Sequence, residues 1–394
     1  MKLRNPQEQQ GLRAPAPNTV QSWVLRFGLY ELIRIKEPAS DWVLFIDHSC
    51  QLGHQKCLVI LGIRLCHWAT LKRPLTYHDM TFILMKIVDG SDGDKVKKQL
   101  LEAKTLIGTV HSIVSDQGSD LVNGLKKLVD EQRMLKETPS KIFKDISHAS
   151  SHIFKERLLS DPNWQEFLGC CGKTQPQVKQ TILGSLAPPT QKVKGRYLNI
   201  GEMITWGQKM LAQIDDRTGK LPDKVDRTQL EKKYSWIGRF RNSMKEWEEL
   251  HRIREASMAY LRSAGYHALA ASTLRSKLSS LRSCPASQRM VNQIVELVHE
   301  QSSELEFGDS IPASTEVLES LIGKGKQMLG QHSRGGFTKM VLGMGAALAR
   351  VTEEKIVQSL EAVREFDLRT WASRNLGTTL TSIRRAVLNG TKIT

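Results

Sequence analysis

Three acidic side chains of this 394-residue chain have the positions that a metal-dependent phosphodiester reaction requires. Asp47 ends an apolar run, Asp116 ends another, and Glu319 lies on an expected helix much further along the chain. Carboxylate oxygens are the ligands that Mg²⁺ prefers. Two such ions about 3.5–4 Å apart activate an attacking oxygen and stabilise the leaving one. If the two strands are neighbours and the helix packs on them, these three carboxylates can hold two divalent metals.

Other polar residues close to these positions have two interpretations each. Asp145 and His148 follow a further expected strand, and either a structural role or a supporting role beside the metal ligands fits them. Glu316 precedes Glu319 on the same expected helix, which Ser314 should start. In a first helical turn the helix dipole is enough to explain a carboxylate. Glu319 is flanked by leucine and isoleucine, where an uncompensated charge is costly, so we assign the third metal ligand to Glu319.

The elements that must position these residues follow from the hydrophobic pattern. Short apolar, β-rich runs alternate with stretches of helical periodicity in the order β-β-β-α-β-α-β-α. Such an order predicts an α/β domain with a mixed sheet flanked by helices, in which strands one and four are adjacent. Asp120 should cap the second helix. The expected strands are residues 42–47, 56–65, 81–88, 111–115 and 141–146, and the expected helices are 95–107, 121–129 and 149–159.

The rest of the chain suggests two additions to this domain. Residues 1–40 read as an N-terminal arm with one short helix, in which Val20, Trp23, Val24 and Phe27 form an apolar stripe. That helix is either a remnant of a helix-turn-helix or an element that packs on the main domain. Residues 171–310 carry helical patterns only and read as an all-helical insertion. The core would then comprise residues 41–170 and 311–394, the last part being a basic helical tail.

Composition indicates a polyanionic partner. The chain has 57 Lys and Arg against 41 Asp and Glu, a net charge of +16. A surplus of this size favours nucleic acid, and Arg384 and Arg385 in the tail are candidate DNA contacts. No apolar run approaches the roughly 18–20 residues of a membrane helix, so we expect no membrane association. The six cysteines form no Cys-x-x-Cys pair, which is typical of reduced thiols in a cytoplasmic protein.

Five segments resemble bacterial insertion-sequence transposases with a ribonuclease-H-like Asp-Asp-Glu core. They are FIDHSCQLG, SIVSDQGSDL, KDISH, STEVLESLIGKGK and GGFTKMVLGMGAALA. Such proteins cut the ends of a mobile DNA element and join them to a target. The resemblance implies that Asp47, Asp116 and Glu319 are the catalytic metal ligands. It also implies two Mg²⁺ ions, for which Mn²⁺ can substitute, and a helical insertion within the core.

The resemblance extends to one basic residue and to the partners. Related transposases place a lysine seven residues after the glutamate, a position that Lys326 occupies here. Residues i and i+7 share a helix face, so Lys326 is a candidate phosphate contact. The implied partner is double-stranded DNA, bound by a homodimer at the bacterial nucleoid. The tyrosine and arginine of the wider signature fall at Pro312 and Thr315, so the match to that signature is partial.

Two other functions remain open at this point. Transposases generally carry a separate module that recognises the element ends, and this chain offers a single candidate helix before the core. A truncated or repurposed protein that binds DNA in a regulatory role without strand transfer is therefore an alternative. A basic nuclease that is not tied to a mobile element is another.

Overall fold

The computed structural model describes residues 14–52, 55–191, 199–216, 221, 225–331 and 335–390, without the side chains of 49–52. The chain forms two compact units, Met1–Asp145 with Ile311–Thr394 (unit 1) and Ile146–Ser310 (unit 2). The second boundary falls at the expected position. The first lies earlier than the expected residue 171, because α5 (Ile146–Leu159) and α6 (Pro162–Val178) pack with the helices of unit 2.

Unit 1 contains a five-stranded mixed sheet whose strand order is β3-β2-β1-β4-β5. The first three strands pair antiparallel, whereas β4 runs parallel to β1 and β5 parallel to β4. The prediction that the first and fourth strands are adjacent is therefore confirmed, as is the mixed α/β architecture. The strands are β1 (Ala39–Leu52), β2 (Gln55–Arg64), β3 (Thr81–Asp89), β4 (Gly108–Ser115) and β5 (Lys141–Lys144).

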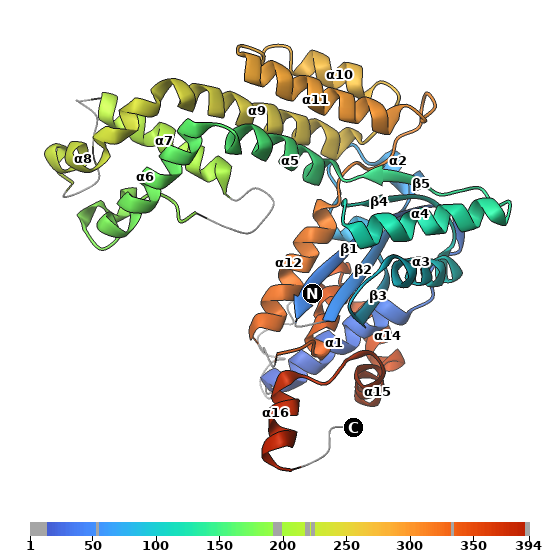
Figure 1. Ribbon diagram of the computed structural model, residues 1–394. Coiled ribbons are helices and arrows are strands. Elements are labelled where there is room, and N and C mark those ends of the chain that lie inside the picture. The colour runs from blue at the N-terminus through green and yellow to red at the C-terminus, as the bar shows by residue number, and fades with distance from the viewer. Residues whose placement is uncertain are drawn as a thin grey trace, which may run out of the picture. The chain divides into compact units, whose positions relative to one another are not determined.

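Helices cover both faces of this sheet (Figure 1). On one face, α3 (Gly93–Ile107) and α4 (Ser119–Met134) bury a core that includes Leu44, Ile46 and Ile113. On the other face, α12 (Glu316–Gln331) packs on β1. Successive side chains of a strand alternate between faces. Because Ile46 points toward α3 and α4, Asp47 belongs to the face that α12 covers.

Helix α1 (Pro17–Ile33) is an integral part of unit 1. Arg26 donates to the backbone carbonyls of Leu360 and Val363, and Ser22 Oγ donates to Glu365 at 2.6 Å. Of the expected apolar stripe, only Phe27 is buried. Val20, Trp23 and Val24 are instead 42–43% exposed. Residues 1–13 of the expected arm lie outside the described part of the chain.

The remaining helices of unit 1 follow the sheet or close the chain. After β2 come α2 (Leu65–Thr70) and the 3₁₀ turn η2 (Tyr77–Asp79). After α12 come η5 (Lys339–Leu342), α13 (Gly343–Leu348), α14 (Glu353–Ala362), α15 (Glu365–Asn375) and α16 (Leu380–Leu388). Residues 339–348 are therefore divided between a 3₁₀ turn and the short helix α13.

Unit 2 is built from helices packed around aromatic side chains. Trp164 and Trp247 meet edge to face with ring centroids 4.9 Å apart, and Phe167 and Phe240 pack beside them. Edge-to-face contacts of this kind add to the free energy of burial. After α5 and α6 come η3 (Ile182–Leu186), α7 (Ile200–Asp215), α8 (Arg227–Tyr234), η4 (Ser235–Phe240), α9 (Arg241–Ala264), α10 (Ala270–Lys277) and α11 (Pro285–Ser302). No helix among the described residues of either unit is long and apolar enough to cross a membrane.

The crossing of α1 and α13 gives a stability prediction. A Cβ at Gly28 would lie 1.9 Å from the carbonyl oxygen of Leu342, and one at Gly345 would lie 2.6 Å from the carbonyl oxygen of Gly28. Gly28→Ala must therefore separate the two backbones. We expect it to lower the free energy of unfolding by about 1–3 kcal/mol, measured by urea denaturation. Gly323→Ala is the control, because that helical glycine has no neighbour within 4 Å, and should raise stability by about 0.5–1 kcal/mol. Equal tolerance of both substitutions would contradict the close crossing.

Candidate metal centre

Three aspartates stand side by side at one edge of the sheet. In the parallel register, Ile46 of β1 pairs with Ser115 of β4, and Ser115 pairs with Lys144 of β5. The next residues along these strands are Asp47, Asp116 and Asp145. The backbone N–H of Asp145 donates to the carbonyl of Ser115 at 2.8 Å, so the ladder continues to this position. Adjacent strands lie about 4.8 Å apart. The register therefore places Asp47, Asp116 and Asp145 at neighbouring positions of the three strands. Among the described residues, the possible ligand atoms that lie within 4.8 Å of one another are those of Asp145, His148 and Glu319, a set that includes neither Asp47 nor Asp116.

The start of α12 is tied to the third of these aspartates. Asp145 is 1% exposed, and its Oδ1 accepts a hydrogen bond of 3.1 Å from the backbone N–H of Thr315. A carboxylate at a helix N-terminus satisfies a backbone donor and favours the helix dipole. Ser314 Oγ accepts from the N–H of Glu316 at 3.2 Å, as expected of the residue that starts the helix. The position of α12 against the sheet is thus fixed through Asp145.

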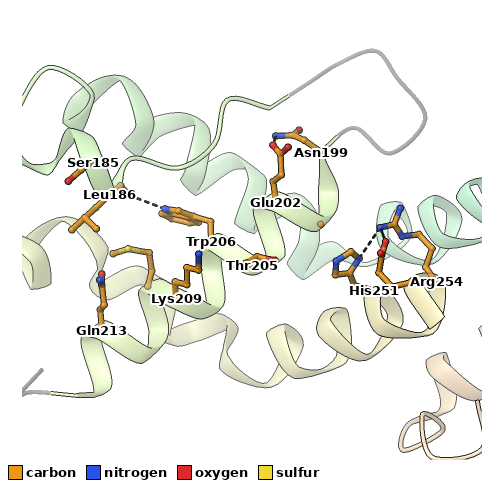
Figure 2. Close-up of a pocket in the computed structure, with 13 residues that line it drawn as sticks. Ser185, Leu186, Asn199, Glu202, Thr205, Trp206, Lys209, Gln213, His251 and Arg254 are labelled. Atoms are coloured by element: carbon orange, nitrogen blue, oxygen red, sulfur yellow. Dashed lines mark hydrogen bonds and ion pairs between the residues drawn. The ribbon is translucent and has the colours of Figure 1, made fainter. Parts of the chain in front are cut away.

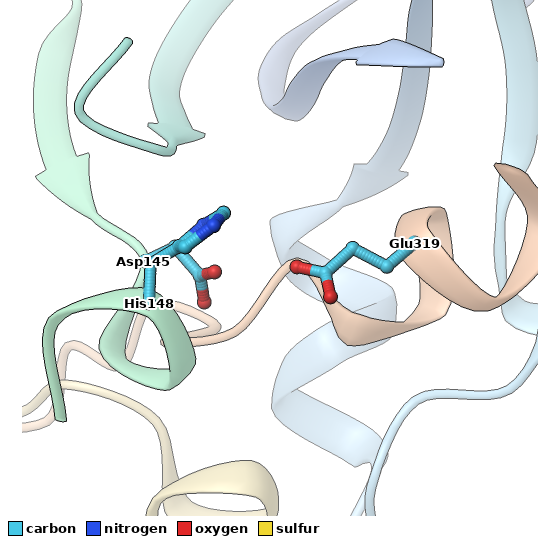
Figure 3. Close-up of side chains that lie close together, drawn as sticks. All are labelled: Asp145, His148 and Glu319. Atoms are coloured by element: carbon cyan, nitrogen blue, oxygen red, sulfur yellow. The ribbon is translucent and has the colours of Figure 1, made fainter. Parts of the chain in front are cut away.

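Glu319 comes into the same region from the first turn of α12. Its carboxylate offers an oxygen within 4.8 Å of an oxygen of Asp145 (Figure 3). The Thr315 hydroxyl donates to Glu319 Oε1 at 3.4 Å. His148, three residues after Asp145, offers a ring nitrogen within the same distance of the Asp145 carboxylate. The sequence left Asp145 a structural or a supporting role, and the structure places its carboxylate within 4.8 Å of that of Glu319.

The helix dipole does not show which of the two glutamates of α12 is the metal ligand. Glu316 and Glu319 both lie in the first turn of the helix, so the dipole favours a carboxylate at either position. What distinguishes Glu319 is its distance to Asp145. Two carboxylates this close oppose each other's ionisation unless a cation or a proton compensates them.

Asp116 and Asp120 hold the turn between β4 and α4. Asp116 Oδ1 accepts from the N–H of Gly118 at 3.0 Å. Asp120 is not the expected helix cap, because α4 starts at Ser119 and Gly118 occupies the cap position. Asp120 instead accepts a 3.1 Å hydrogen bond from Lys56 Nζ and lies 3.6 Å from His48 Nδ1. We call the row of Asp47, Asp116 and Asp145, together with Glu319, the acidic edge. The contacts of Asp120 connect the start of α4 to β1 and β2 directly behind this edge.

Two pKa shifts reflect the partial burial of this network. Burial lowers the pKa of His48, and the charge of Lys56 lowers it further, although Asp120 and Asp116 oppose the shift. Burial acts to raise the pKa of Asp120, but the hydrogen bond from Lys56 and the neighbouring His48 hold it below its usual value. Asp120 therefore remains an anion that is committed to Lys56.

The predicted DNA-contacting residues are all exposed. Lys326 lies two turns beyond Glu319 on α12, and Arg384 and Arg385 lie on α16. Lys324, on the same helix as Lys326, places its ammonium 4.3 Å from the centroid of the Tyr77 ring. The Tyr77 hydroxyl is also 2.6 Å from Ser320 Oγ, which joins η2 to α12. Lysine so close to an expected catalytic glutamate was the available signal for this contact.

The donor set of the acidic edge fits a hard divalent cation. Asp145 and Glu319 offer carboxylate oxygens within 4.8 Å of each other, and the strand register places Asp47 and Asp116 at the neighbouring positions. Carboxylate oxygens suit Mg²⁺ and Mn²⁺. The imidazole of His148, close to Asp145, is a ligand type that Mn²⁺ accepts more readily than Mg²⁺.

Unit 2 contains a separate pocket of about 720 Å³ between η3, α7 and α9 (Figure 2). The Trp206 indole N–H donates to the carbonyl of Leu186 at 3.0 Å, which fixes one wall. Arg254 contacts His251 Nδ1 at 3.3 Å, and burial lowers the pKa of His251. The lining carries lysine and arginine as well as glutamate, so its charges favour no single sign of ligand.

Comparison with known proteins adds no relative. No family model matches the chain, and no curated protein is significantly similar to it.

Two substitutions of Asp145 separate its structural role from metal binding. Asp145→Asn keeps an acceptor for the N–H of Thr315 and should leave stability nearly unchanged, whereas Asp145→Ala leaves that buried donor without its acceptor and should cost about 1–3 kcal/mol.

In the wild type, Mn²⁺ at ten times its Kd should raise stability by about 1.4 kcal/mol. In both variants the Kd for Mn²⁺ should rise at least about tenfold, so the same Mn²⁺ concentration should stabilise them less. Glu316→Gln is the control, and calorimetric titration together with thermal unfolding provides the readout. A wild type that ignores Mn²⁺ would refute the metal centre.

Proposed function

We propose that the chain is a ribonuclease-H-like transposase of the Asp-Asp-Glu type, which cleaves the ends of a mobile DNA element and transfers them to a target. The strand order β3-β2-β1-β4-β5, with three antiparallel strands followed by two parallel ones, is compatible with that fold. The division of the chain supports the proposal as well, since a helical unit interrupts the core between β5 and α12.

The observation that carries the proposal is the adjacency of Asp47 and Asp116 beneath α12. These residues follow the paired positions Ile46 and Ser115, on the sheet face that α12 covers. Glu319 enters from the first turn of that helix, 203 positions after Asp116 (319 − 116). Glu319 lies within 4.8 Å of Asp145, which the register places next to Asp116. Carboxylates from two strands and a packed helix are the arrangement that phosphodiester chemistry with two Mg²⁺ ions uses.

Each residue has a definite task in this proposal. Asp47, Asp116 and Glu319 would hold the Mg²⁺ ions, for which Mn²⁺ can substitute. When bound, the metal supplies an activated oxygen nucleophile and stabilises the leaving oxygen. Asp145 holds the N-terminus of α12 through Thr315, and its carboxylate, within 4.8 Å of Glu319, would be a further ligand of the metal. Lys326, exposed on α12, would contact a phosphate of the DNA backbone.

The proposed partner is double-stranded DNA, bound by a homodimer at the nucleoid in the bacterial cytoplasm. The net charge of +16 favours a polyanion. Exposed Arg384 and Arg385 on α16 are suited to phosphate contacts, which position a protein on DNA without reading its sequence.

Cleavage by active-site variants tests the reaction directly. Asp47→Asn, Asp116→Asn and Glu319→Gln should each lower metal-dependent nicking of duplex DNA at least about a hundredfold, because each removes a charged metal ligand. Binding to the same DNA in EDTA should be unchanged. Glu316→Gln should retain activity and is the matched control on the same helical turn. If the Glu316 variant is inactive and the Glu319 variant is active, the assignment of the catalytic glutamate is wrong.

The same assay distinguishes the proposed function from its alternatives. A transposase joins defined ends to a target, a nuclease only cuts, and a repurposed DNA-binding protein does neither. With duplexes taken from the DNA that flanks the coding region, strand transfer into a target plasmid is therefore the expected result. Tight DNA binding with no nicking in Mg²⁺ or Mn²⁺ would establish the regulatory alternative.

Salt dependence tests the DNA contacts of α16. Each phosphate contact contributes a slope of about −0.9 to log K against log salt. The double variant Arg384→Ala and Arg385→Ala should reduce the magnitude of that slope by about 2 and weaken binding to all sequences equally. Lys104→Ala is the control, because Lys104 is already paired with Glu137. Unchanged binding in the double variant, measured by fluorescence anisotropy in EDTA, would remove α16 from the interface.

A further inference from the structure

Unit 1 has a pocket of about 310 Å³ between the end of α1, β3, α3 and α15. Most of the lining is apolar, and Leu106 and Trp371 belong to it. No residue of the acidic edge lines this pocket. Small-molecule sites are typically apolar with a few polar groups, and their volumes start at about 300 Å³. The pocket therefore has the size and character of a site for a small ligand.

Lys36 is the most deeply buried charged residue of this lining. It is 4% exposed, whereas the side chains of Arg34, Lys86 and Glu102 are 29–41% exposed. Full burial of a lysine is rare, because an ammonium ion loses its hydration there. A lysine at the inner side of an apolar pocket is thus a candidate for chemistry that uses the neutral amine.

The contacts of Lys36 suit that neutral form. Its Nζ donates to the carbonyl of Glu31 at 2.7 Å and to that of Leu32 at 3.2 Å, both in the last turn of α1. A neutral amine has two N–H groups and one lone pair, so these two carbonyls match its donors, whereas an ammonium has three donors and no lone pair. Burial lowers the pKa of Lys36 to about 7, and Arg34 acts in the same direction, although Glu31 opposes the shift. Near neutral pH the neutral fraction is therefore about a thousand times that of an ordinary lysine.

The charges around the pocket favour an anionic ligand. Arg34 and Lys86 belong to the lining, and Glu102, the one acid among the lining residues, is paired with Lys86 at 2.7 Å. The buried carboxylate of Glu31 is shared by Arg34 at 2.8 Å and Lys355 at 3.2 Å. Three cations thus surround two carboxylates, and the surplus of positive charge attracts an anion.

We propose that Lys36 is a nucleophilic lysine that binds a small anionic aldehyde in this pocket as a reversible Schiff base. Lysines that are desolvated in an apolar pocket or lie beside another cation are activated for this reaction. Nζ attacks the carbonyl carbon, a C–N bond forms, and water leaves with the carbonyl oxygen and both amine hydrogens. A proton taken up from solvent gives the imine one N–H, which can donate to the carbonyl of Glu31. Trp371 would contact the apolar body of the ligand, and Arg34 its anionic group. The inference does not depend on the proposed catalytic function.

Reductive trapping in the full wild-type chain tests this reaction. The chain is incubated near neutral pH with para-carboxybenzaldehyde, an anionic probe, and with cyanoborohydride, which reduces the imine to a stable amine. Peptide mass spectrometry should show that Lys36 is labelled at least about a hundredfold faster than Lys127, an exposed lysine paired with Asp94. Equal or slower labelling of Lys36 would show that this lysine only caps α1, and would overturn the proposal.

A matched neutral probe tests the ligand class. The methyl ester of para-carboxybenzaldehyde has the same ring and aldehyde without the charge. It should label Lys36 at least about fivefold more slowly than the anionic probe, because the positive surplus no longer attracts it. Equal rates for the two probes would overturn the assignment of an anionic ligand.

Variants connect the label to binding. Lys36→Arg keeps a donor for the carbonyls of α1 but forms no imine, because its guanidinium stays protonated. Without reductant, the anionic probe should raise the unfolding temperature of the wild type and not that of Lys36→Arg. Lys127→Met is the control and should behave as the wild type. Equal stabilisation of Lys36→Arg would overturn the Schiff base, and the labelling of the wild-type chain decides the proposal if the variant does not fold.

Discussion

The parallel ladder that joins β1, β4 and β5 determines the position of the candidate metal centre. A strand shifted by one residue would turn every side chain to the other face of the sheet. Here the register is held by fully buried apolar residues on both faces, such as Phe45 and Ile46 on β1 and Val114 on β4. Because that register continues by one residue, Asp47, Asp116 and Asp145 follow in a row. The acidic edge is a direct consequence of sheet packing.

The second requirement is that α12 returns to this edge after all of unit 2. The entropic cost of closing a loop grows only slowly with its length, so a core can accept a long insertion between two of its elements. The hydrogen bond from the Thr315 N–H to the buried carboxylate of Asp145 makes the return specific, since it joins the end of β5 to the start of α12. Asp145 thus stabilises the fold and lies next to Glu319 at once.

The sequence predicted the five strands because each is an apolar, β-rich run between turn residues, and the order of elements predicted that β1 and β4 are adjacent. The position of the first boundary of the insertion could not be predicted, because α5 has no clear amphipathic pattern. Its buried face includes Ser147, Ser150 and Ser151, which do not indicate against which unit the helix packs. The role of Asp145 was also out of reach, since its partner Thr315 is 170 positions away. An apolar stripe on a helix normally packs against the rest of the domain. Val20, Trp23 and Val24 are instead exposed, so this part of the stripe does not follow that pattern.

The central claim is that the acidic edge of unit 1 holds the metal that cleaves DNA. Anomalous diffraction from crystals grown with Mn²⁺ tests it most directly, because the signal locates the ion without reference to activity. The account predicts one or two Mn²⁺ peaks within about 2.0–2.6 Å of carboxylate oxygens from Asp47, Asp116 and Glu319. An acidic edge without a peak at saturating Mn²⁺, with Asp145 still bound to the N–H of Thr315, would contradict the claim and leave the acids with a structural role alone.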